Sequence, residues 1–428
     1  MAINPAQFDA VVDALRRVLP CERPADAVLS AYFRDMRKLG AQDRHLIAET
    51  IFAVLRRRAF LTALTAPSAT PRRLVIASLI KVRGLNVREL DGILTEAEKK
   101  WVVELKAAHP ELDLAGRAEL PEWVVDALRA GGQDDDAIVA LGHSMQNSAP
   151  LDLRANTLKM RREDVLAALR AAGLELAPTP FSPVGLRVKG KPPINRHPLF
   201  LEGAVEVQDE GSQLLGLLVG ARRGEMVVDF CAGAGGKTLA IGATMRSTGR
   251  LYAFDVSAHR LDALKPRMAR SGLSNIHPAA IAHERDERIK RLAGKIDRVL
   301  VDAPCSGLGT LRRNPDLKWR QSAKAVQELV VKQAAILDSA ARLLKPGGRL
   351  VYATCSILPQ ENEAIAEAFT AAHPDFLPLD AGEVLGQLKV EQAASLCSGG
   401  ETGTAYLRMW PHRHQTDGFF AAVWTRKG

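Results

Sequence analysis

The sequence predicts a multidomain protein in which an all-α N-terminal domain precedes a small α+β module and a doubly wound α/β domain. Apolar residues recur at helical spacing over roughly the first 140 residues, where strand signals are weak. A strand–helix–strand pattern follows over residues 151–188, and from about residue 205 short apolar strands alternate with helices. Such alternation indicates a parallel sheet. We therefore place the domains at 1–145, 146–204 and 205–428.

The N-terminal domain is predicted to consist of helices that each bury one apolar face. In the clearest case, apolar residues occupy positions 46, 47, 51, 54 and 55, on one side of a helix. A Gly131-Gly132 pair and three consecutive acids at 134–136 mark a break near the end of the domain. The predicted helices cover residues 6–19, 24–39, 42–64, 71–83, 120–131 and 136–146.

The two C-terminal parts differ in the order of their predicted elements. In the small module, strands at 151–156 and 185–188 flank a helix at 162–172. In the α/β domain, strands and helices alternate along the chain. The strands predicted there cover residues 226–230, 250–255, 297–301 and 348–353, and the helices cover 236–245, 257–270 and 324–344.

The positive charge of the chain is concentrated after residue 150. Lys and Arg number 58 against 49 Asp and Glu, a formal net charge of +9. Residues 1–150 hold 20 bases and 20 acids, and residues 151–203 hold nine bases and five acids. A tight basic cluster comprises Arg312, Arg313, Lys318 and Arg320. The excess of bases indicates a polyanionic partner but does not identify it.

Composition also narrows the class of protein and its compartment. No apolar run approaches the roughly 18 residues needed to cross a bilayer, so we expect no membrane segment. The first residues lack the basic and apolar regions of a signal peptide. Five cysteines without a CxxC pair argue against a disulfide scaffold or a zinc ribbon. The expectation is a cytoplasmic, monomeric protein without a metal site.

A glycine-rich turn is predicted between the strand at 226–230 and the helix at 236–245. It comprises Cys231, Ala232, Gly233, Ala234, Gly235, Gly236 and Lys237. Glycines allow a backbone to approach a ligand closely, and a helix N-terminus favours negative charge. A phosphate-binding loop would need glycine in place of Cys231, and a dinucleotide fingerprint would need it in place of Thr238. S-adenosyl-L-methionine (AdoMet) remains, because it also binds at the first turn of a doubly wound sheet.

The next strand supports this cofactor. It ends in Asp255, 18 residues after Lys237, and an acid at this place is suited to binding a ribose diol. The alternative is that Asp255 caps the helix that begins near Ser257. Because the glycine turn precedes this strand, we favour the ribose contact.

Two cysteines directly follow predicted strands. Cys305 and Cys355 each lie a few residues beyond the apolar run, and each is followed by serine. In a doubly wound fold, the C-terminal ends of the strands form the reaction crevice, so both thiols are candidates for chemistry. Most free cysteines are instead small buried apolar residues. That interpretation applies to Cys21, Cys231 and Cys397.

These motifs resemble the Nop/Sun family of RNA cytosine-C5 methyltransferases, and within it the bacterial 16S ribosomal RNA enzymes with a NusB-like N-terminal domain. The resemblance covers most of the chain. It is most specific at residues 302–319 (DAPCSGLGTLRRNPDLKW) and 352–363 (YATCSILPQENE). Shorter matches are FLEG at 200–203, VQDE at 207–210, PHRH at 411–414 and TDGFF at 416–420, with a NusB-like helix from DRH at 43–45 to RRR at 56–58.

The resemblance implies a role for each candidate catalytic residue. Cys355 would be the nucleophile that attacks C6 of cytosine, and Cys305 would assist release of the product. Asp302 would face the methionyl amine and the target base, which Lys237 could also reach. The chemistry needs a thiol, because C5 of cytosine becomes nucleophilic enough for methylation only after a thiolate has added to C6.

The resemblance also implies how a Rossmann-like catalytic domain binds AdoMet. The turn at 231–237 would line the cofactor, and Asp255 would contact the ribose. The acid near the adenine would be Glu284, with Asp286 as the alternative. Turns in relatives often read Ala-Pro-Gly-Gly-Lys, whereas this chain has Gly233-Ala234 before the glycine pair.

RNA is the expected partner, with ribosomal RNA favoured by the resemblance. Lys and Arg side chains in the module at 151–203 would hold the RNA through contacts to its phosphates. The target cytosine would be unpaired or flipped out. One alternative is the same chemistry on transfer RNA. A second is a non-catalytic RNA-binding or ribosome-assembly factor, against which the retained Cys305 and Cys355 argue. A third is an amino-methylating enzyme, which would carry an Asn/Asp-Pro-Pro-aromatic motif at residues 302–305.

Overall fold

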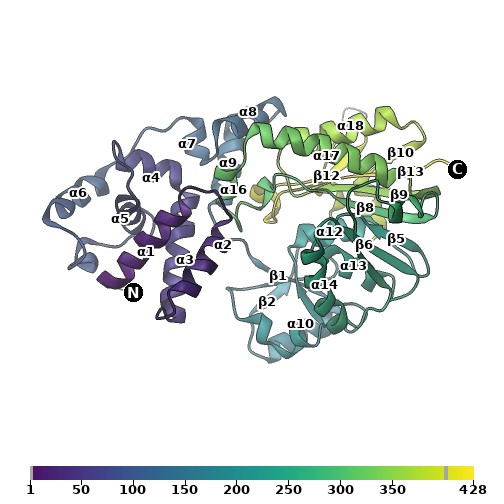
Figure 1. The fold of residues 1–428 in the computed structure, drawn as a ribbon, viewed down its shortest axis with the longest axis horizontal. Helices are drawn as coiled ribbons and strands as arrows, with labels where there is room; N and C mark the ends of the chain where they lie inside the picture. The colour runs from purple at the N-terminus through teal and green to yellow at the C-terminus, as the bar shows by residue number, and fades with distance from the viewer. Residues whose placement is uncertain (1–2, 400–402) are drawn as a thin grey trace. The chain divides into compact units, whose positions relative to one another are not determined.

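The chain divides into two units, and a short segment from its C-terminal half belongs to the N-terminal one. The computed structural model describes residues 3–399 and 403–428. The helical unit comprises the residues up to Ser148 together with Thr310–Ala323. The second unit comprises Ala149–Gly309 and the remainder after Lys324. Figure 1 labels the elements of both.

The helical unit is built from amphipathic helices around one apolar core. The fifth helix lies at its centre, since all seven residues from Leu74 to Ile80 are buried. The helices are α1 (Pro5–Val18), α2 (Ala25–Asp35), α3 (Ala41–Arg56), α4 (Arg58–Thr65), α5 (Pro71–Lys81), α6 (Glu96–Ala107), α7 (Leu114–Ala118), α8 (Glu122–Ala130) and α9 (Asp135–Met145), with α16 (Leu317–Arg320) from the later segment.

The predicted helix at 42–64 is in fact two helices, α3 and α4, which separate at Arg57. The carboxylate of Glu119 explains the break, because it accepts hydrogen bonds from the backbone amides of Ala59 (2.9 Å) and Phe60 (3.0 Å). These amides belong to the first turn of α4 and have no partner within the helix. A side chain 60 residues away thus caps a helix that the local sequence does not separate from α3.

The segment Thr310–Ala323 is an integral part of the helical unit. Lys318 is 5% exposed, and its ammonium donates to the carbonyls of Arg56 (3.0 Å) and Glu119 (2.7 Å). Trp319 donates its indole N–H to the carbonyl of Leu55 at 3.1 Å. Burial lowers the pKa of Lys318 to about 8. The basic cluster seen in the sequence is therefore partly buried, with Lys318 satisfying helix-end carbonyls.

This placement also redistributes the net charge. The helical unit, with Thr310–Ala323 included, holds 24 bases and 21 acids. The second unit holds the remaining 34 bases and 28 acids, so the two units carry +3 and +6. Both units therefore have a moderate positive charge.

We predict that Lys318→Met destabilises the helical unit by about 2–4 kcal/mol. The substitution keeps the length of the side chain but leaves two buried carbonyls without a donor. Thermal unfolding and limited proteolysis of the full chain measure the effect. Lys38→Met, at an exposed lysine of the same unit, is the control and should change neither. Equal unfolding temperatures for the two variants would contradict the role of Lys318.

The second unit begins with a small antiparallel sheet in the order β2-β3-β1-β4. Helix α10 (Arg162–Ala171) packs on it through Val165 and Leu169, which are fully buried together with Leu153, Leu186 and Val205 of the sheet. The strands are β1 (Leu151–Ala155), β2 (Leu176–Pro178), β3 (Gly185–Val188) and β4 (Val205–Val207). The predicted strand–helix–strand module is thus present, with two further strands.

A larger mixed sheet forms the rest of this unit, in the order β11-β12-β13-β9-β8-β5-β6-β7, and β10 also pairs with β13. Strands β9, β8, β5, β6 and β7 are parallel, whereas β13 runs antiparallel to β9. The strands are β5 (Met226–Asp229), β6 (Arg250–Asp255), β7 (Ile276–Ala280), β8 (Ile296–Asp302), β9 (Leu344–Thr354), β10 (Phe376–Leu379), β11 (Cys397–Gly399), β12 (Ala405–Met409) and β13 (Phe419–Arg426).

The parallel sheet predicted from the sequence is present in β9, β8, β5, β6 and β7, and the structure adds antiparallel strands in its C-terminal part. No strand was predicted after residue 353, and β10 to β13 are antiparallel additions to the edge. Strand β7 was also missed, because it is short and contains Pro278, which is unfavourable in a strand interior. Pro278 is tolerated because β7 is the edge strand of the sheet.

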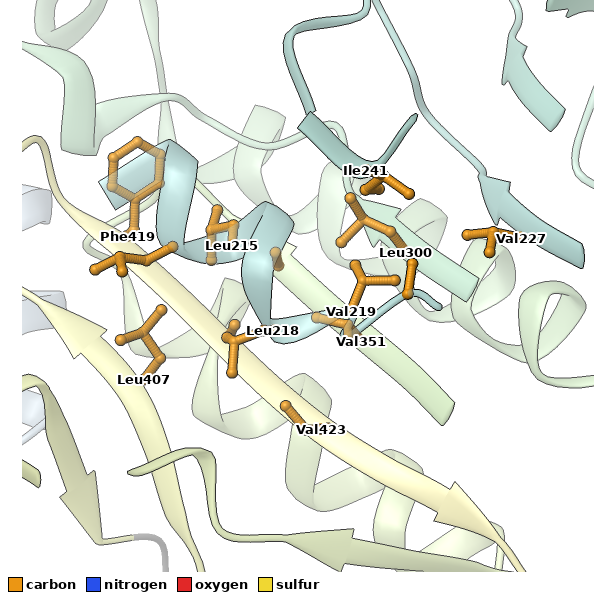
Figure 2. Packing of buried hydrophobic residues seen from close by; sticks show 14 of the residues in the cluster. Leu215, Leu218, Val219, Val227, Ile241, Leu300, Val351, Leu407, Phe419 and Val423 are labelled. Carbon is orange, nitrogen blue, oxygen red and sulfur yellow. The ribbon is translucent and has the colours of Figure 1, made fainter. Parts of the chain in front are cut away.

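Helices cover the large sheet and fix its position. Leu215, Leu218 and Val219 of the α12 region lie against side chains of several strands, including Leu300, Val351 and Val423 (Figure 2). Each fully buried leucine contributes roughly 1.5–3 kcal/mol. These helices are α12 (Glu210–Leu218), α13 (Gly236–Thr244), α14 (Ala258–Ser271), α17 (Ala323–Ala341), α18 (Glu363–Ala372) and α19 (Ala381–Gln387). The strand ends consequently have a rigid support.

Candidate catalytic and cofactor site

The predicted site residues follow strands whose carboxyl ends lie at one edge of the sheet. The chain continues from β5 to β6 on one side and returns to β8 on the other, so the topological switch point lies between β5 and β8. Ligands of doubly wound folds bind outside this point. The glycine turn follows β5, Asp302 ends β8, and Cys355 follows β9, whose Ala353 pairs with Asp302. The structure therefore brings these three segments together.

Two glycines of the turn are required for different reasons. Gly233 (φ +56°) and Gly235 (φ +82°) both have the left-handed conformation that favours glycine. A Cβ at Gly235 would lie 2.1 Å from Cδ1 of Leu264, so this glycine permits α14 to pack closely. A Cβ at Gly233 would meet nothing within 4 Å, so its side of the turn is open. The turn is thus packed at its base and accessible at its tip.

The remaining turn residues anchor it to the sheet. The amide of Ala232, which is buried, donates to the carbonyl of Phe254 in β6 at 2.8 Å. Burial raises the pKa of the neighbouring Cys231 well above its usual value, which is consistent with a packing role. Ala234 is exposed, and Gly236 begins α13.

Asp255 connects the end of β6 to the glycine turn. It is 5% exposed, and one carboxylate oxygen accepts a hydrogen bond from the amide of Gly233 at 2.8 Å. The other accepts from the amide of Ser257 at 2.7 Å. Ser257 itself is the N-cap of α14, since its hydroxyl accepts from the amide of Arg260. Asp255 therefore contributes to the entry of α14 and also holds the tip of the cofactor turn.

Asp229, the last residue of β5, is a site residue that the sequence interpretation missed. It is 1% exposed, and Thr238 donates to its Oδ2 at 2.6 Å. Its Oδ1 is buried without a hydrogen-bond partner among the described residues. Burial, with further contributions from the charges of Asp302 and Asp255, raises the pKa of Asp229 to about 7. The sequence did contain the signal, an acid between a buried strand and a glycine turn.

We predict that Asp229 makes the stability of the protein depend on pH. Because its pKa rises from 3.8 to about 7 on folding, the folded state binds more protons in this interval, and stability falls as pH increases through it. The full effect, present above pH 7, is at most about 4 kcal/mol. Relative to Asp229→Asn, the wild-type unfolding temperature should therefore fall by roughly 5–10 °C between pH 4.5 and 7.5.

The control for this prediction is Asp262→Asn, because the Asp262 side chain is 62% exposed. This variant keeps Asp229, so its unfolding temperature should fall with increasing pH in parallel with that of wild type. A constant difference in unfolding temperature between wild type and Asp229→Asn would show that Asp229 is ionised across this range.

Lys237 and Asp302 form an ion pair beside the turn. Nζ of Lys237 lies 2.7 Å from Oδ2 of Asp302, and the two side chains are 12% and 29% exposed. Burial lowers the pKa of Lys237, but the charge of Asp302 and the hydrogen bond to it outweigh this effect, so the pKa is raised. The negative charge of a Cys355 thiolate acts in the same direction. Lys237 therefore remains a cation close to both Asp302 and Cys355.

The two candidate cysteines are in contact. Their Sγ atoms lie 3.4 Å apart, a hydrogen-bonding distance for thiols. The hydrogen bond with Cys355, burial, and the charges of Cys355 and Glu361 together raise the pKa of Cys305 well above its usual value. Cys305 is therefore a thiol at neutral pH. The sequence placed each cysteine at a strand end, and the structure shows that the two strands are neighbours and brings the sulfur atoms together.

The TDGFF motif at 416–420 packs against both cysteine-bearing turns. Gly309 donates its amide to the carbonyl of Cys355 at 2.9 Å and accepts a hydrogen bond from the amide of Gly418 at 2.8 Å. A Cβ on Gly309 would lie 2.1 Å from the carbonyl oxygen of Gly418. Close backbone approach therefore explains a motif that sequence reasoning could only match to relatives.

The two candidates for the adenine contact differ in their hydrogen bonding. Asp286 caps α15 (Glu287–Lys290), and its carboxylate accepts from the amides of Ala282 (3.0 Å) and Arg288 (2.9 Å). These backbone hydrogen bonds lower the pKa of Asp286. Glu284 is partly exposed and makes a long ion pair with Arg285 at 3.8 Å. Both acids lie beyond the end of β7, and both carboxylate oxygens of Asp286 already accept backbone amides.

The bases of the small module are mostly paired with its own groups. Arg154 is buried and donates to Gln208 at 2.6 Å, and Arg187 pairs with the buried Asp152 at 2.7 Å. The exposed pairs are Arg161–Asp164, Arg162–Glu163 and Lys189–Glu175. Exposed pairs are weak and can exchange partners. Binding of RNA by this module stays a prediction, and fewer bases serve it than the sequence count suggests.

The sequence predicts neither a metal site nor a membrane-spanning helix. Within residues 3–399 and 403–428, there is no group of three or more His, Cys, Asp or Glu side chains that could hold a metal ion. In the same part of the chain, every helix is too short or too polar to span a membrane.

Comparison with known proteins shows the family and the fold of the chain. The family described as 16S rRNA methyltransferase RsmB/F matches residues 217–425, and the ferredoxin-like domain of RsmF/B-like methyltransferases matches residues 120–195. The crystal structure titled PH0851 is 26% identical, has a TM-score of 0.77 and covers 99% of both chains. The predicted order of a helical region, an α+β module and a Rossmann-like domain is thereby confirmed.

Two curated relatives carry the same family name. Ribosomal RNA small subunit methyltransferase B of Pasteurella multocida is 31% identical over 79% of this chain and 72% of its own length. The protein of that name from Pseudomonas syringae pv. tomato is 34% identical over 75% of this chain and 71% of its own length. The chain therefore belongs to the RsmB/F family of 16S rRNA methyltransferases.

Proposed function

We propose that this protein transfers a methyl group from AdoMet to C5 of a specific cytosine in 16S rRNA, with Cys355 as the covalent nucleophile. One observation carries the proposal. The sulfur atoms of Cys305 and Cys355 lie 3.4 Å apart at the edge of the sheet that also bears the glycine turn. A transfer to an amino group or a hydroxyl would need no thiol. Methylation of a carbon that must first be activated needs a thiolate nucleophile, and a second thiol beside it can assist release.

The residues around the turn fit AdoMet. Its sulfonium and ammonium groups are cationic, and the turn adjoins three acids, Asp229, Asp255 and Asp302, which interact electrostatically. The unpartnered Oδ1 of Asp229 offers a further acceptor. The open side of Gly233 leaves room for close approach. When bound there, AdoMet supplies an electrophilic methyl carbon.

Each residue near the turn then has a distinct task in binding. Residues 231–237 would line the cofactor, Asp255 would contact its ribose, and Asp302 would contact the methionyl amine. Glu284 would contact the adenine, with Asp286, which caps α15, as the alternative.

The catalytic residues support covalent activation of the base. The Cys355 thiolate forms a bond to C6, which moves the electron pair of the C5–C6 double bond towards C5 and makes that carbon a nucleophile. After methylation, water takes the C5 proton, the C5–C6 double bond re-forms, and the bond between C6 and the Cys355 sulfur breaks. Lys237 remains a cation close to Cys355, and the charge of a Cys355 thiolate helps to raise the pKa of its ammonium. Cys305, which holds its proton, would assist the release.

The choice of RNA rests on the names of the relatives, since the chemistry would be the same on transfer RNA. Bisulfite sequencing of 16S rRNA and transfer RNA from a deletion strain tests it. One cytosine of 16S rRNA should lose its methylation, and wild-type protein should restore it. Loss confined to transfer RNA would contradict the rRNA assignment. An unchanged methylation pattern in both RNAs would favour a non-catalytic assembly role.

A further inference from the structure

The serines that follow the two cysteines are in contact with each other. Ser306 and Ser356 are 1% and 0% exposed, and their hydroxyl oxygens lie 3.2 Å apart. Both hydroxyls also contact one carboxylate oxygen, Oε2 of Glu361. The turns after β8 and β9 are therefore joined through one acidic side chain.

The second carboxylate oxygen of Glu361 holds the turn after β8 in two further ways, directly through Ser306 and indirectly through Gln333. Oε1 accepts from the amide of Ser306 at 2.8 Å and from the side-chain amide of Gln333 at 3.0 Å. The same Gln333 nitrogen also donates to the carbonyl of Pro304, adjacent to Cys305, at 3.0 Å. Glu361 is fully buried, and all of these donors are neutral. A buried carboxylate is costly unless it is well hydrogen-bonded, so this set of donors indicates a specific arrangement.

The backbone around Glu361 is fixed as well. Its carbonyl accepts a hydrogen bond from the hydroxyl of Tyr352, a fully buried residue of β9, at 2.7 Å. The next residue, Asn362, donates from its side chain to the carbonyl of Ser356 at 3.0 Å. Arg408, 4% exposed, donates to the carbonyl of Ile357 at 2.9 Å. These hydrogen bonds hold the backbone that carries the Glu361 carboxylate in a fixed position.

We propose that Glu361 is a positioning residue that clamps the two Cys-Ser turns and keeps Cys305 and Cys355 at contact distance. This inference deepens the proposed function and rests on it for its catalytic consequence. Its geometric part stands independently, because it concerns only the distance between two sulfur atoms. The Glu361 carboxylate is hydrogen-bonded to both serines and to Gln333, so it positions the cysteines through the turns that carry them.

The charge of Glu361 adds a second effect. Together with the contact to Cys355 and burial, it favours the protonated form of Cys305. The clamp therefore also helps Cys305 to retain its proton.

Oxidative cross-linking measures the clamp without reference to methylation. Diamide takes up the two thiol hydrogens and becomes the hydrazine, while a disulfide forms between the two sulfur atoms. In the full-length wild-type protein, peptide mass spectrometry should show rapid formation of the Cys305–Cys355 disulfide. In Glu361→Ala the rate should fall by about tenfold, and Glu361→Gln should be intermediate because it keeps one acceptor oxygen. Glu225→Gln is the matched control. Glu225 directly precedes β5 and forms an ion pair with Arg298, at the end of the parallel strands opposite to the two cysteines.

Kinetics give the catalytic consequence. A displacement of reacting groups by about 1 Å can cost on the order of 100-fold in rate, so kcat of Glu361→Ala should fall by about that factor. The KM for RNA and the affinity for AdoMet should stay within about twofold of wild type, because Glu361 contacts neither in the proposed arrangement. General loss of structure would instead affect AdoMet binding too.

The outcomes separate the clamp from the function. Cross-linking of Glu361→Ala at the wild-type rate, or no cross-link in wild type, would overturn the clamp whatever the methylation assay shows. If Glu361→Ala cross-links slowly but wild-type protein methylates no cytosine, the clamp is supported and the proposed function is overturned. If Glu361→Ala fails to fold, the double variant Ser306→Ala/Ser356→Ala replaces it, with Ser339→Ala, a buried serine of α17, as its control. A wild-type cross-linking rate in this double variant would likewise overturn the clamp.

Discussion

Cys355→Ala is expected to abolish methylation of the RNA while AdoMet still binds. Without the sulfur, no bond forms to C6, and C5 lacks the electron density needed to accept a methyl group. Removal of a covalent nucleophile typically costs about 10⁴-fold or more in rate. The turn that would bind AdoMet follows β5 and, among the residues that the structure describes, makes no hydrogen bond to Cys355, so the cofactor affinity should change by less than about twofold.

The measurement pairs methyl incorporation from labelled AdoMet with calorimetric titration of AdoMet. Cys397→Ala is the control, because Cys397 lies in β11 and burial raises the pKa of its thiol to about 12. That variant should keep full activity. Activity of Cys355→Ala within tenfold of wild type would exclude Cys355 as the nucleophile and shift attention to Cys305.

The sequence was sufficient for the parts of the site that depend on local pattern. An apolar strand followed by glycines, or by Cys-Ser, marks a strand end, and parallel strands place such ends at one edge. The AdoMet-dependent methyltransferase class and the Rossmann-like fold were predicted correctly for this reason. The contact between Cys305 and Cys355 follows from β8 and β9 being neighbours, which two successive strands often are.

The sequence was insufficient wherever one residue acts on another far along the chain. Glu361 lies in a motif that matched relatives, yet its contact with Ser306 spans 55 residues and depends on the turn geometry. From the sequence, Lys318 looked like part of a surface basic cluster. In the structure it is buried, and it donates hydrogen bonds to two helix-end carbonyls in the other half of the chain. The break between α3 and α4 depends in the same way on Glu119. Local periodicity carries no information about such partners.

Cys305→Ala is expected to have the opposite phenotype to Cys355→Ala, because it should trap the protein on its RNA. The Cys305 thiol is held against the sulfur of Cys355 and keeps its proton at neutral pH. It can therefore assist when Cys355 departs from C6 but is not needed for the attack. Loss of a positioned proton-transfer group slows a step by roughly 10²–10⁴-fold, so the adduct should accumulate before release.

Denaturing gels of the variant with labelled 16S rRNA fragments should show a retarded band that protease removes. The double variant Cys305→Ala/Cys355→Ala should show no such band, since the covalent bond comes from Cys355. Absence of the band in Cys305→Ala, with turnover intact, would exclude a role in release. A band that persists in the double variant would place the covalent bond on a different residue. The roles of the two cysteines can therefore be tested separately, because the sulfur of Cys355 forms the bond to the base and Cys305 permits that bond to break.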